Sequence, residues 1–348
     1  MENNQEEVEN LLNLIYSGDL DSIQLSVAIA KGLGIDIRTM VENLGWPKFG
    51  FSKLRDFHDR NVCFLYFTQL DDLQLLSKAA RIEHLYILKG KILSLKGLEN
   101  MHKLTRLYLN ETEVVNFQAV RLYLNHLEAN SLKADFQPKM DFVSAFPDLE
   151  LLSFKDNQVD KSDYFANKKR LKSLFLGNNS LKEINGLYKM SQLEHLQLND
   201  NQLVEIDLTP FPLLKSLNLD NNSIESLDFL NLDRLETLSV CQNQLTEAHF
   251  KYNFELTFVE LSYNKLTTFE IKDKLHLKKI NLIGNFIQTL HLSNLPELRE
   301  LNLAFNPLEK LTFDNLPRLS RVQLSNELKN SDVHKLLKTQ FPKVQILF

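Results

Sequence analysis

Leucine and polar residues alternate in a unit that repeats from about residue 82 to the C-terminus. The unit is L-x-x-L-x-L-x-x-N-x-L, and its clear copies start 21 or 22 residues apart. These clear copies begin at Leu171, Leu193, Leu214, Leu235, Leu256, Leu277 and Leu298. The asparagine closes eight consecutive copies at the same place, as Asn157, Asn179, Asn201, Asn222, Asn243, Asn264, Asn285 and Asn306. A fixed period in the low twenties predicts a solenoid of stacked coils.

The spacing of residues within one copy predicts its local structure. Leu196 and Leu198 alternate with polar residues, which predicts one short strand with both leucines pointing inward. Strands stacked about 4.8 Å apart would form a parallel sheet, and the asparagine amide would satisfy backbone groups of the following turn. A second alternation, as in Leu290 and Leu292, predicts extended or polyproline-like segments on the opposite side instead of full helices.

This unit resembles the repeat of the leucine-rich repeat family, in the bacterial 21/22-residue form of internalin-like and phosphatase-regulatory-like proteins. The resemblance covers roughly three quarters of the chain, because weaker copies begin at Ile82, Leu104, Leu124, Leu149 and Leu319 and give about twelve repeats. It implies an α/β solenoid, the leucine-rich repeat horseshoe, with a parallel concave sheet and a mostly non-helical convex side. Such a platform hosts many unrelated functions.

The chain is expected to have three parts. Residues 1–60 show helical spacing, as at Val8, Leu11, Leu12 and Ile15, and are expected to form a helical N-terminal cap or leader, with a separate interaction module as the alternative. Residues 61–330 hold the repeat array. A strand near Val62 is expected to precede the first repeat, and an irregular loop is expected between Leu124 and Leu149, where the register is ambiguous.

Residues 331–348 are expected to form a C-terminal cap. Ser331 suits the N-cap of a short helix that ends at Gln340. Phe341, Val344 and Ile346 then predict a last strand that begins 22 residues after Leu319, in register with the preceding repeat.

Charge and composition exclude several classes of function. The net charge is −5, and residues 1–60 carry 10 acidic and 6 basic groups, which leaves 35 and 34 for the rest of the chain. A nearly neutral array lacks the basic stripe that nucleic-acid binding requires. No apolar run approaches the ~20 residues of a membrane span. The acidic N-terminus lacks the regions of a secretory signal, and two cysteines form no framework, so we expect a cytoplasmic protein.

Motifs for catalysis, cofactors and metals are missing from the sequence, so we expect a protein that is not an enzyme and needs no cofactor. His84, His126 and His195 occupy equivalent repeat positions, but their strands are expected to lie too far apart for a shared metal site. Cys241 follows a predicted strand at a variable position, where partial exposure is expected.

The concave sheet is the expected binding surface. Tyr86, Tyr108 and Phe175 stand at the outward position between the inward leucines, and His84, Arg106 and His126 stand two places before that position in their strands. Binding hot spots favour tyrosine and arginine, so these six residues are the candidate partner site. The alternative is that the tyrosines pack as cross-strand neighbours or lie beneath the leader. The outward positions at the C-terminal end are mostly amides and hydroxyls, which predicts a solvated face.

The sequence therefore predicts a monomeric, non-enzymatic scaffold that binds another protein on its concave face. A first alternative is a regulatory subunit that binds and modulates an enzyme such as a phosphatase, since residues 184–188 (Ile-Asn-Gly-Leu-Tyr) resemble that class of repeat. A second alternative is a bacterial effector or surface recognition protein. The identity of the partner does not follow from the sequence.

Overall fold

A computed structural model of the chain describes residues 62–66, 69–74, 82–116, 124–132, 143, 146–230 and 232–348. The chain divides into two compact units, Met1–Asp135 (unit 1) and Phe136–Phe348 (unit 2). The expected helices of residues 1–60 and most of the expected loop before Leu149 lie outside the described residues. The leader therefore stays a prediction from sequence.

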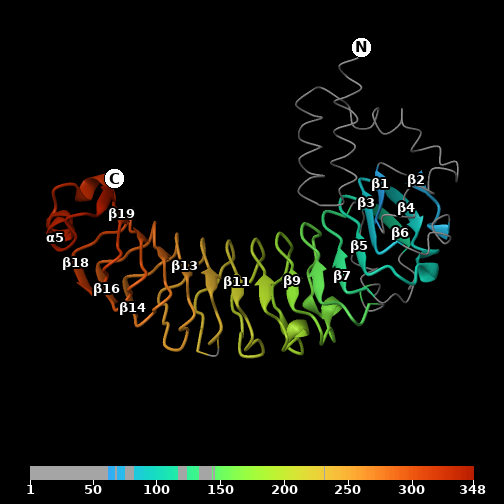
Figure 1. The fold of residues 1–348 in the computed structure, drawn as a ribbon, viewed down its shortest axis with the longest axis horizontal. Helices are drawn as coiled ribbons and strands as arrows, with labels where there is room; N and C mark the ends of the chain where they lie inside the picture. Colours follow the sequence, from blue (N-terminus) through green and yellow to red (C-terminus); the bar gives the residue numbers. More distant parts are fainter. Residues whose placement is uncertain are drawn as a thin grey trace, which may run out of the picture. The chain divides into compact units, whose positions relative to one another are not determined.

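Unit 1 contains two short parallel sheets (Figure 1). The first consists of β1 (Val62–Tyr66), β3 (His84–Leu88), β5 (Arg106–Tyr108) and β7 (His126–Glu128). The second consists of β2 (Gln69–Leu70), β4 (Lys91–Ser94) and β6 (Glu113–Asn116), and the 3₁₀ helix η2 (Leu98–Asn100) follows β4. The strand predicted near Val62 is confirmed, and β7 fixes the register of the repeat that begins at Leu124.

Unit 2 stacks its coils in sequence order, so that each strand pairs in parallel with the equivalent strand of the next coil (Figure 1). One sheet consists of β8 (Leu151–Ser153), β9 (Ser173–Phe175), β10 (His195–Gln197), β11 (Ser216–Asn218), β12 (Thr237–Ser239), β13 (Phe258–Glu260), β15 (Lys279–Asn281), β17 (Glu300–Asn302), β19 (Arg321–Gln323) and β20 (Gln345–Leu347). This sheet is the concave sheet of the predicted fold.

The convex side of unit 2 carries extended segments and 3₁₀ turns, as the second alternation predicts. Its elements are β14 (Thr268–Lys272), β16 (Thr289–Ser293) and β18 (Lys310–Asp314), which pair in parallel, and the 3₁₀ helices η4 (Ser162–Phe165), η5 (Asn185–Leu187) and η6 (Asn326–Leu328). Within the described part of the chain, the one α-helix is α5 (Asp332–Gln340). The predicted parallel-strand solenoid with little helix is confirmed.

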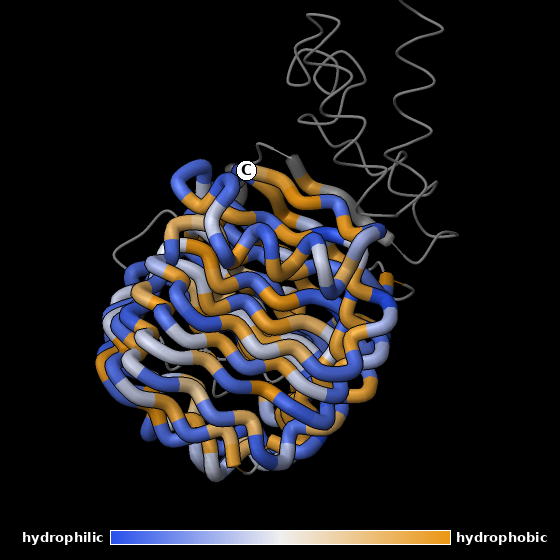
Figure 2. The backbone as a smooth tube through the Cα atoms, turned by 90° about the vertical axis from the view of Figure 1, so that its left-hand side faces the viewer, coloured by the Kyte–Doolittle hydropathy of each residue, from blue (hydrophilic) through white to orange (hydrophobic). Residues whose placement is uncertain are grey.

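Burial follows the leucine pattern coil by coil. In β10, Leu196 is buried while His195 and Gln197 on either side are half-buried, and the same pattern recurs in β11, β12 and β13. Figure 2 shows the resulting alternation of hydrophobic and hydrophilic residues along each coil. Because every coil supplies its own leucines, the core is a continuous column between the sheet and the convex segments.

The asparagines form a hydrogen-bonded ladder through unit 2. Each one from Asn179 to Asn306 donates its amide hydrogens to carbonyls of its own coil and of the preceding coil, and its oxygen accepts a backbone N–H of the preceding coil. For Asn243, the acceptors are Leu219 O at 2.9 Å and Cys241 O at 3.1 Å, and the donor is Ile224 N at 3.0 Å. These bonds give partners to backbone groups of the turns that would otherwise be buried and unpaired.

The residue before each asparagine adopts the left-handed backbone conformation. Its φ lies between 53° and 67° in eight consecutive coils, at Asp156, Asn178, Asp200, Asn221, Gln242, Tyr263, Gly284 and Phe305. Glycine, asparagine and aspartate tolerate this conformation, whereas for other residues it is less stable than the right-handed one by roughly 1–2 kcal/mol. The first four coils follow that preference, but Gln242, Tyr263 and Phe305 do not.

A column of buried side chains also runs through the turns that precede the strands. Each of its members stands three residues before the first leucine of its repeat. Most of its members are apolar, but polar members interrupt it: Phe146, Lys168, Met190, Phe211, Leu232, Asn253, Lys274, Leu295 and Leu316. Lys168 is 3% exposed, and this desolvation lowers the pKa of its ammonium group from 10.5 to about 8. The charged lysine therefore destabilises the core at neutral pH.

We expect Lys168→Met to raise the free energy of unfolding at pH 7 by on the order of 1 kcal/mol, because methionine already fills the equivalent position at Met190. In the natural chain the unfolded state holds more protons than the folded state between about pH 8 and 10.5, so stability rises with pH across that window. The variant should lack this rise. Chemical denaturation at neutral and alkaline pH measures both effects, and the exposed neighbour Lys169→Met serves as control.

The C-terminal cap differs from its prediction in one respect. Ser331 accepts a hydrogen bond from His334 N and caps α5, as expected, and a last strand follows the helix. That strand pairs Val322 with Ile346, an offset of 24 residues, so the predicted offset of 22 is wrong. The helix lengthens the connection by two residues, which moves Val344 out of the strand and into the turn before it.

Candidate functional site

Five of the six candidate residues meet on neighbouring strands of unit 1. The parallel register places His84 beside Arg106 and Arg106 beside His126, and it places Tyr86 beside Tyr108. Phe175 lies on β9 in unit 2, where it is half-buried and the Lys155 Nζ atom stands 5.1 Å from its ring centroid. The candidate site of unit 1 therefore consists of the five residues on β3, β5 and β7.

Tyr86 and Tyr108 stack against each other. Their ring centroids are 4.0 Å apart with an angle of 5° between the planes, and the imidazole of His126 lies 5.0 Å from the Tyr108 ring. The two tyrosines are only 4% and 5% exposed, and burial raises the pKa of Tyr86 above its usual value. The expectation of two solvent-facing rings is wrong, because large side chains at this position lie flat against their cross-strand neighbours.

Arg106 is the permanently charged member of these five residues, and its side chain is exposed. Burial, and next the positive charge of Arg106, lower the pKa of the half-buried His84. The Nε2 atom of His126 lies 2.9 Å from Glu128 Oε1. Arg106 is therefore an exposed cation two residues before Tyr108 on β5, with His84 and His126 at the paired positions of the neighbouring strands.

Catalytic chemistry finds little support in the described residues. No group of three or more His, Cys, Asp or Glu side chains among them is placed to hold a metal ion. Cys241 is a free, half-buried thiol, and burial together with the carboxylates of Asp220 and Glu260 raises its pKa to about 12. A thiol held in the protonated form is a poor nucleophile. No described helix has the length and apolar character needed to cross a membrane.

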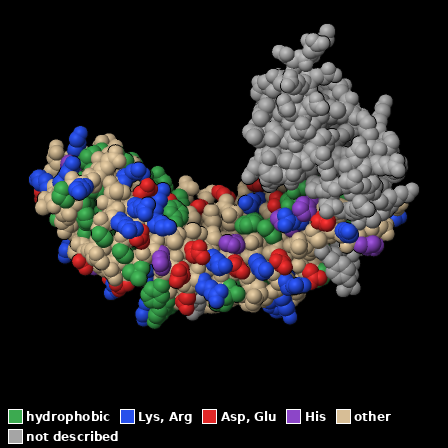
Figure 3. Space-filling view, viewed as in Figure 1, with side chains coloured by type: hydrophobic (Ala, Val, Ile, Leu, Met, Phe, Trp, Pro, Cys, Tyr) green, Lys and Arg blue, Asp and Glu red, His purple; other side chains and the backbone are tan. Residues whose placement is uncertain are grey.

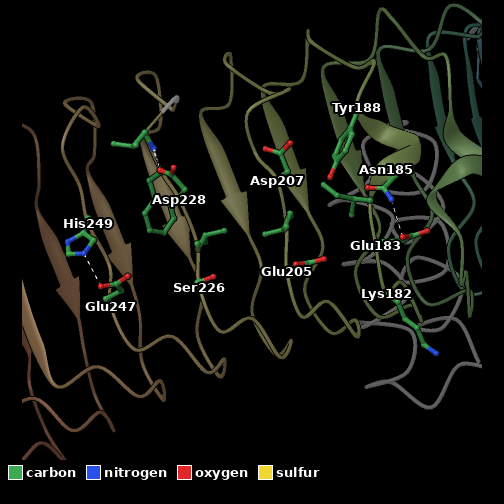
Figure 4. A pocket seen from close by; sticks show the side chains of 15 residues that line it. Lys182, Glu183, Asn185, Tyr188, Glu205, Asp207, Ser226, Asp228, Glu247 and His249 are labelled. Carbon is green, nitrogen blue, oxygen red and sulfur yellow. Dashed lines mark hydrogen bonds and ion pairs between the residues drawn. The ribbon is translucent and has the colours of Figure 1, made fainter.

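A groove of about 790 Å³ runs across the convex segments of unit 2 (Figure 4). Carboxylates from successive coils line it, at Glu183, Glu205, Asp207, Asp228 and Glu247. Four of these carboxylates interact with a residue two positions later in their own coil, at Asn185, Thr209, Leu230 and His249. These bonds explain the acidic residues as local turn contacts on a solvated face.

Exposed aromatic residues mark the last coils of unit 2, where the sequence predicted only a solvated polar face. Tyr263, Phe286 and Phe305 are 51%, 58% and 65% exposed. They flank the ladder asparagines rather than occupying the two outward strand positions from which the prediction was made. A comparison of the positions beside Asn264, Asn285 and Asn306 with those of earlier repeats would have revealed them.

Comparisons with known proteins agree with the repeat pattern. The family model described as Leucine Rich repeats (2 copies) matches residues 169–212. An internalin, InlF of Listeria monocytogenes, is similar in structure with a TM-score of 0.57 and 26% identity, over 74% of this chain and 78% of that one. No curated protein matches the chain.

Two further solved structures share the fold at lower identity. A leucine-rich repeat protein of Leptospira interrogans has a TM-score of 0.64 and 20% identity, over 85% of this chain and 92% of that one. A chain from the octameric complex of latrophilin 3, Unc5D and FLRT2, in which FLRT2 supplies leucine-rich repeats, has a TM-score of 0.52 and 21% identity, over 77% and 83%. The repeat unit, the asparagine ladder and these matches show that the chain has the leucine-rich repeat fold, and residues 169–212 match the family model itself.

Proposed function

We propose that this chain is a non-enzymatic scaffold that binds another protein on the concave sheet. Leucine-rich repeat proteins are generally scaffolds for protein interactions, and their rigid sheets present side chains from many coils at fixed spacing. Monomeric state and cytoplasmic location accompany this proposal as predictions from sequence.

The observation that carries the proposal is the arrangement around Arg106. Its guanidinium is exposed, whereas the stacked Tyr86 and Tyr108 rings on the adjacent register positions are held in one geometry. Arginine is enriched among binding hot spots, and its planar guanidinium loses less conformational freedom per hydrogen bond than an ammonium group does. His84 and His126 add hydrogen-bonding groups on both sides.

We expect Arg106→Glu to weaken binding of the partner by roughly 30-fold or more, the effect of losing a hot spot worth about 2 kcal/mol. The partner is first obtained by affinity capture from the native source, and its affinity is then measured with the purified full-length chain. Arg234→Glu is the matched control, since Arg234 is also exposed but lies outside the strands. Unchanged affinity of the Arg106→Glu variant would contradict this location of the site.

The same capture experiment separates the two main functional readings. A stoichiometric enzyme whose turnover changes on binding would favour the regulatory-subunit alternative. A partner without catalytic activity would favour the plain scaffold, and turnover by the purified chain alone would contradict both.

A further inference from the structure

Four neighbouring strands of unit 2, β9, β10, β11 and β12, carry no lysine, arginine, aspartate or glutamate on their outward positions. We call the first and last residues of these four strands the neutral face. Serine, threonine, asparagine, glutamine, one histidine and one phenylalanine occupy it. Charge returns on the outward positions of the next two strands, at Glu260 and Lys279. The neutral face is therefore a distinct part of the sheet.

The residues that follow these strands keep the surface close to neutral. Two places after the four strands stand Gly177, Asn199, Asp220 and Cys241. Both carboxylate oxygens of Asp220 accept a hydrogen bond from Ser239 Oγ, at 2.7 and 2.9 Å, and one of them also accepts a bond from Cys241 N at 2.6 Å. Asp220 is therefore already bound within the protein and offers little to a cationic ligand.

Ion pairs balance most of the charge at the rim of the neutral face where the strands begin. Lys172 Nζ lies 3.0 Å from Glu150, Lys215 Nζ lies 2.6 Å from Glu194, and Glu236 adds a third carboxylate. Figure 3 shows charged side chains of both signs interspersed over the middle coils of unit 2. This rim therefore lacks the surplus of cations that phosphate groups require.

A hollow of about 430 Å³ opens at the other rim, where the strands end, and its volume is within the range of small-ligand sites. Amides from three successive coils line it, at Asn178, Gln197, Asn199 and Asn218. Among the described residues, the side-chain amide of Gln197 has no hydrogen-bond partner. Because an amide both donates and accepts hydrogen bonds, the hollow suits a ligand whose groups also do both.

The charged residues of the hollow are one lysine and two aspartates, Lys155, Asp156 and Asp200. Neighbouring amides already bind both carboxylates. Asp156 Oδ1 accepts a hydrogen bond from Asn178 Nδ2 at 2.6 Å, and Asp200 Oδ2 accepts one from Asn199 Nδ2 at 2.6 Å. The hollow therefore does not select a ligand by its charge.

Phe175 lies beside this hollow. It pairs in register with Gln197, and Lys155, which lines the hollow, places its Nζ atom 5.1 Å from the ring centroid of Phe175. Gly177 keeps the space open, because a Cβ atom there would stand 2.7 Å from Oδ1 of Asn199. The site therefore combines amide groups with one half-buried aromatic ring.

We propose that the neutral face and its hollow bind a neutral carbohydrate. Sugar hydroxyls donate and accept hydrogen bonds, as the amides of Gln197 and Asn199 do, and the apolar C–H face of a sugar ring packs against Phe175. This carbohydrate site shares no residue with the protein-binding site around Arg106, so each can fail without the other.

Other classes of ligand match the neutral face less well. The centres of protein interfaces are rich in tyrosine, tryptophan and arginine and poor in serine, whereas the neutral face has three serines and none of those large residues. Nucleic acids need cations along their phosphates. An apolar ligand would bury the amides of the hollow without hydrogen bonds.

The test uses the full-length protein and four neutral oligosaccharides: maltotetraose, cellotetraose, mannotetraose and chitotetraose. We expect at least one of them to saturate the protein in isothermal titration calorimetry, with a Kd on the order of 1 mM or tighter. Tetragalacturonate, an acidic oligosaccharide of the same length, should bind more weakly than the best neutral one, because the rims carry more carboxylates than cations.

Three variants test the residues of the site with the best neutral oligosaccharide. Gln197→Leu and Phe175→Leu should each weaken its binding by roughly ten-fold, since they remove an amide and an aromatic ring. Gly177→Ala should also weaken it, because the added methyl group displaces the Asn199 amide. Gln323→Leu is the matched control, since Gln323 is half-buried at the same strand position on β19.

Thermal unfolding separates lost binding from lost folding. Gln197→Leu and Gln323→Leu change equivalent outward positions, so both should melt at the temperature of the natural chain. The proposal is overturned if none of the four neutral oligosaccharides saturates the protein at about 10 mM. It is also overturned if tetragalacturonate binds more tightly than all of them, or if Gln197→Leu binds as well as Gln323→Leu does.

Discussion

A chain that ends at residue 330 is expected to aggregate or to lose cooperative unfolding. Removing α5 and β20 uncovers the end of the solenoid, where Leu324 and Val322 are buried at present. It also removes Leu337 and Val333, which α5 buries against that end. An exposed apolar coil with an unpaired strand edge associates readily with other chains. Light scattering and thermal unfolding followed by circular dichroism measure the outcome.

Two point variants test the same cap without deleting any residues. Leu337→Ala should lower the free energy of unfolding by about 2–5 kcal/mol, the usual loss for a buried leucine, while the exposed neighbour Lys338→Ala should change it little. A truncated chain that stays monomeric and melts as the intact protein does would show that α5 and β20 do not cap the array.

The solenoid could be predicted from the sequence because every coil has the same spacing of leucine and asparagine residues. Leu196 of β10, Leu198 after it and Asn201 have local roles that repeat from coil to coil, so many copies show the same pattern. The alternation at Leu290 and Leu292 likewise predicted the extended convex segment, which is the β16 strand. Such features need only local sequence and the rule that each coil stacks on the last.

Features that depend on one pair of neighbours escaped prediction. Tyr86 and Tyr108 occupy outward strand positions, and these positions did not predict that the side chains are buried. Their burial depends on how the two rings stack across adjacent strands. The register of β20 depended on the length of the connection through α5, which the repeat period does not determine. The exposed aromatic residues of the last coils were missed because Tyr263 and Phe305 occupy a turn position that the strand alternation leaves out.

The asparagine ladder gives the sharpest test of the stacked coils. We expect Asn243→Leu to lower the free energy of unfolding by about 1–3 kcal/mol, because leucine leaves the Ile224 N–H and the Leu219 carbonyl without the hydrogen bonds that Asn243 provides. Both partners belong to the preceding coil, so the damage should spread beyond the mutated repeat. Chemical denaturation measures the loss, and hydrogen exchange should show faster exchange at Ile224 and in the coils on both sides. Glu247→Leu, an exposed change in the same repeat, is the control. If Asn243→Leu unfolds at the same denaturant concentration as the natural chain, the ladder does not hold the coils together.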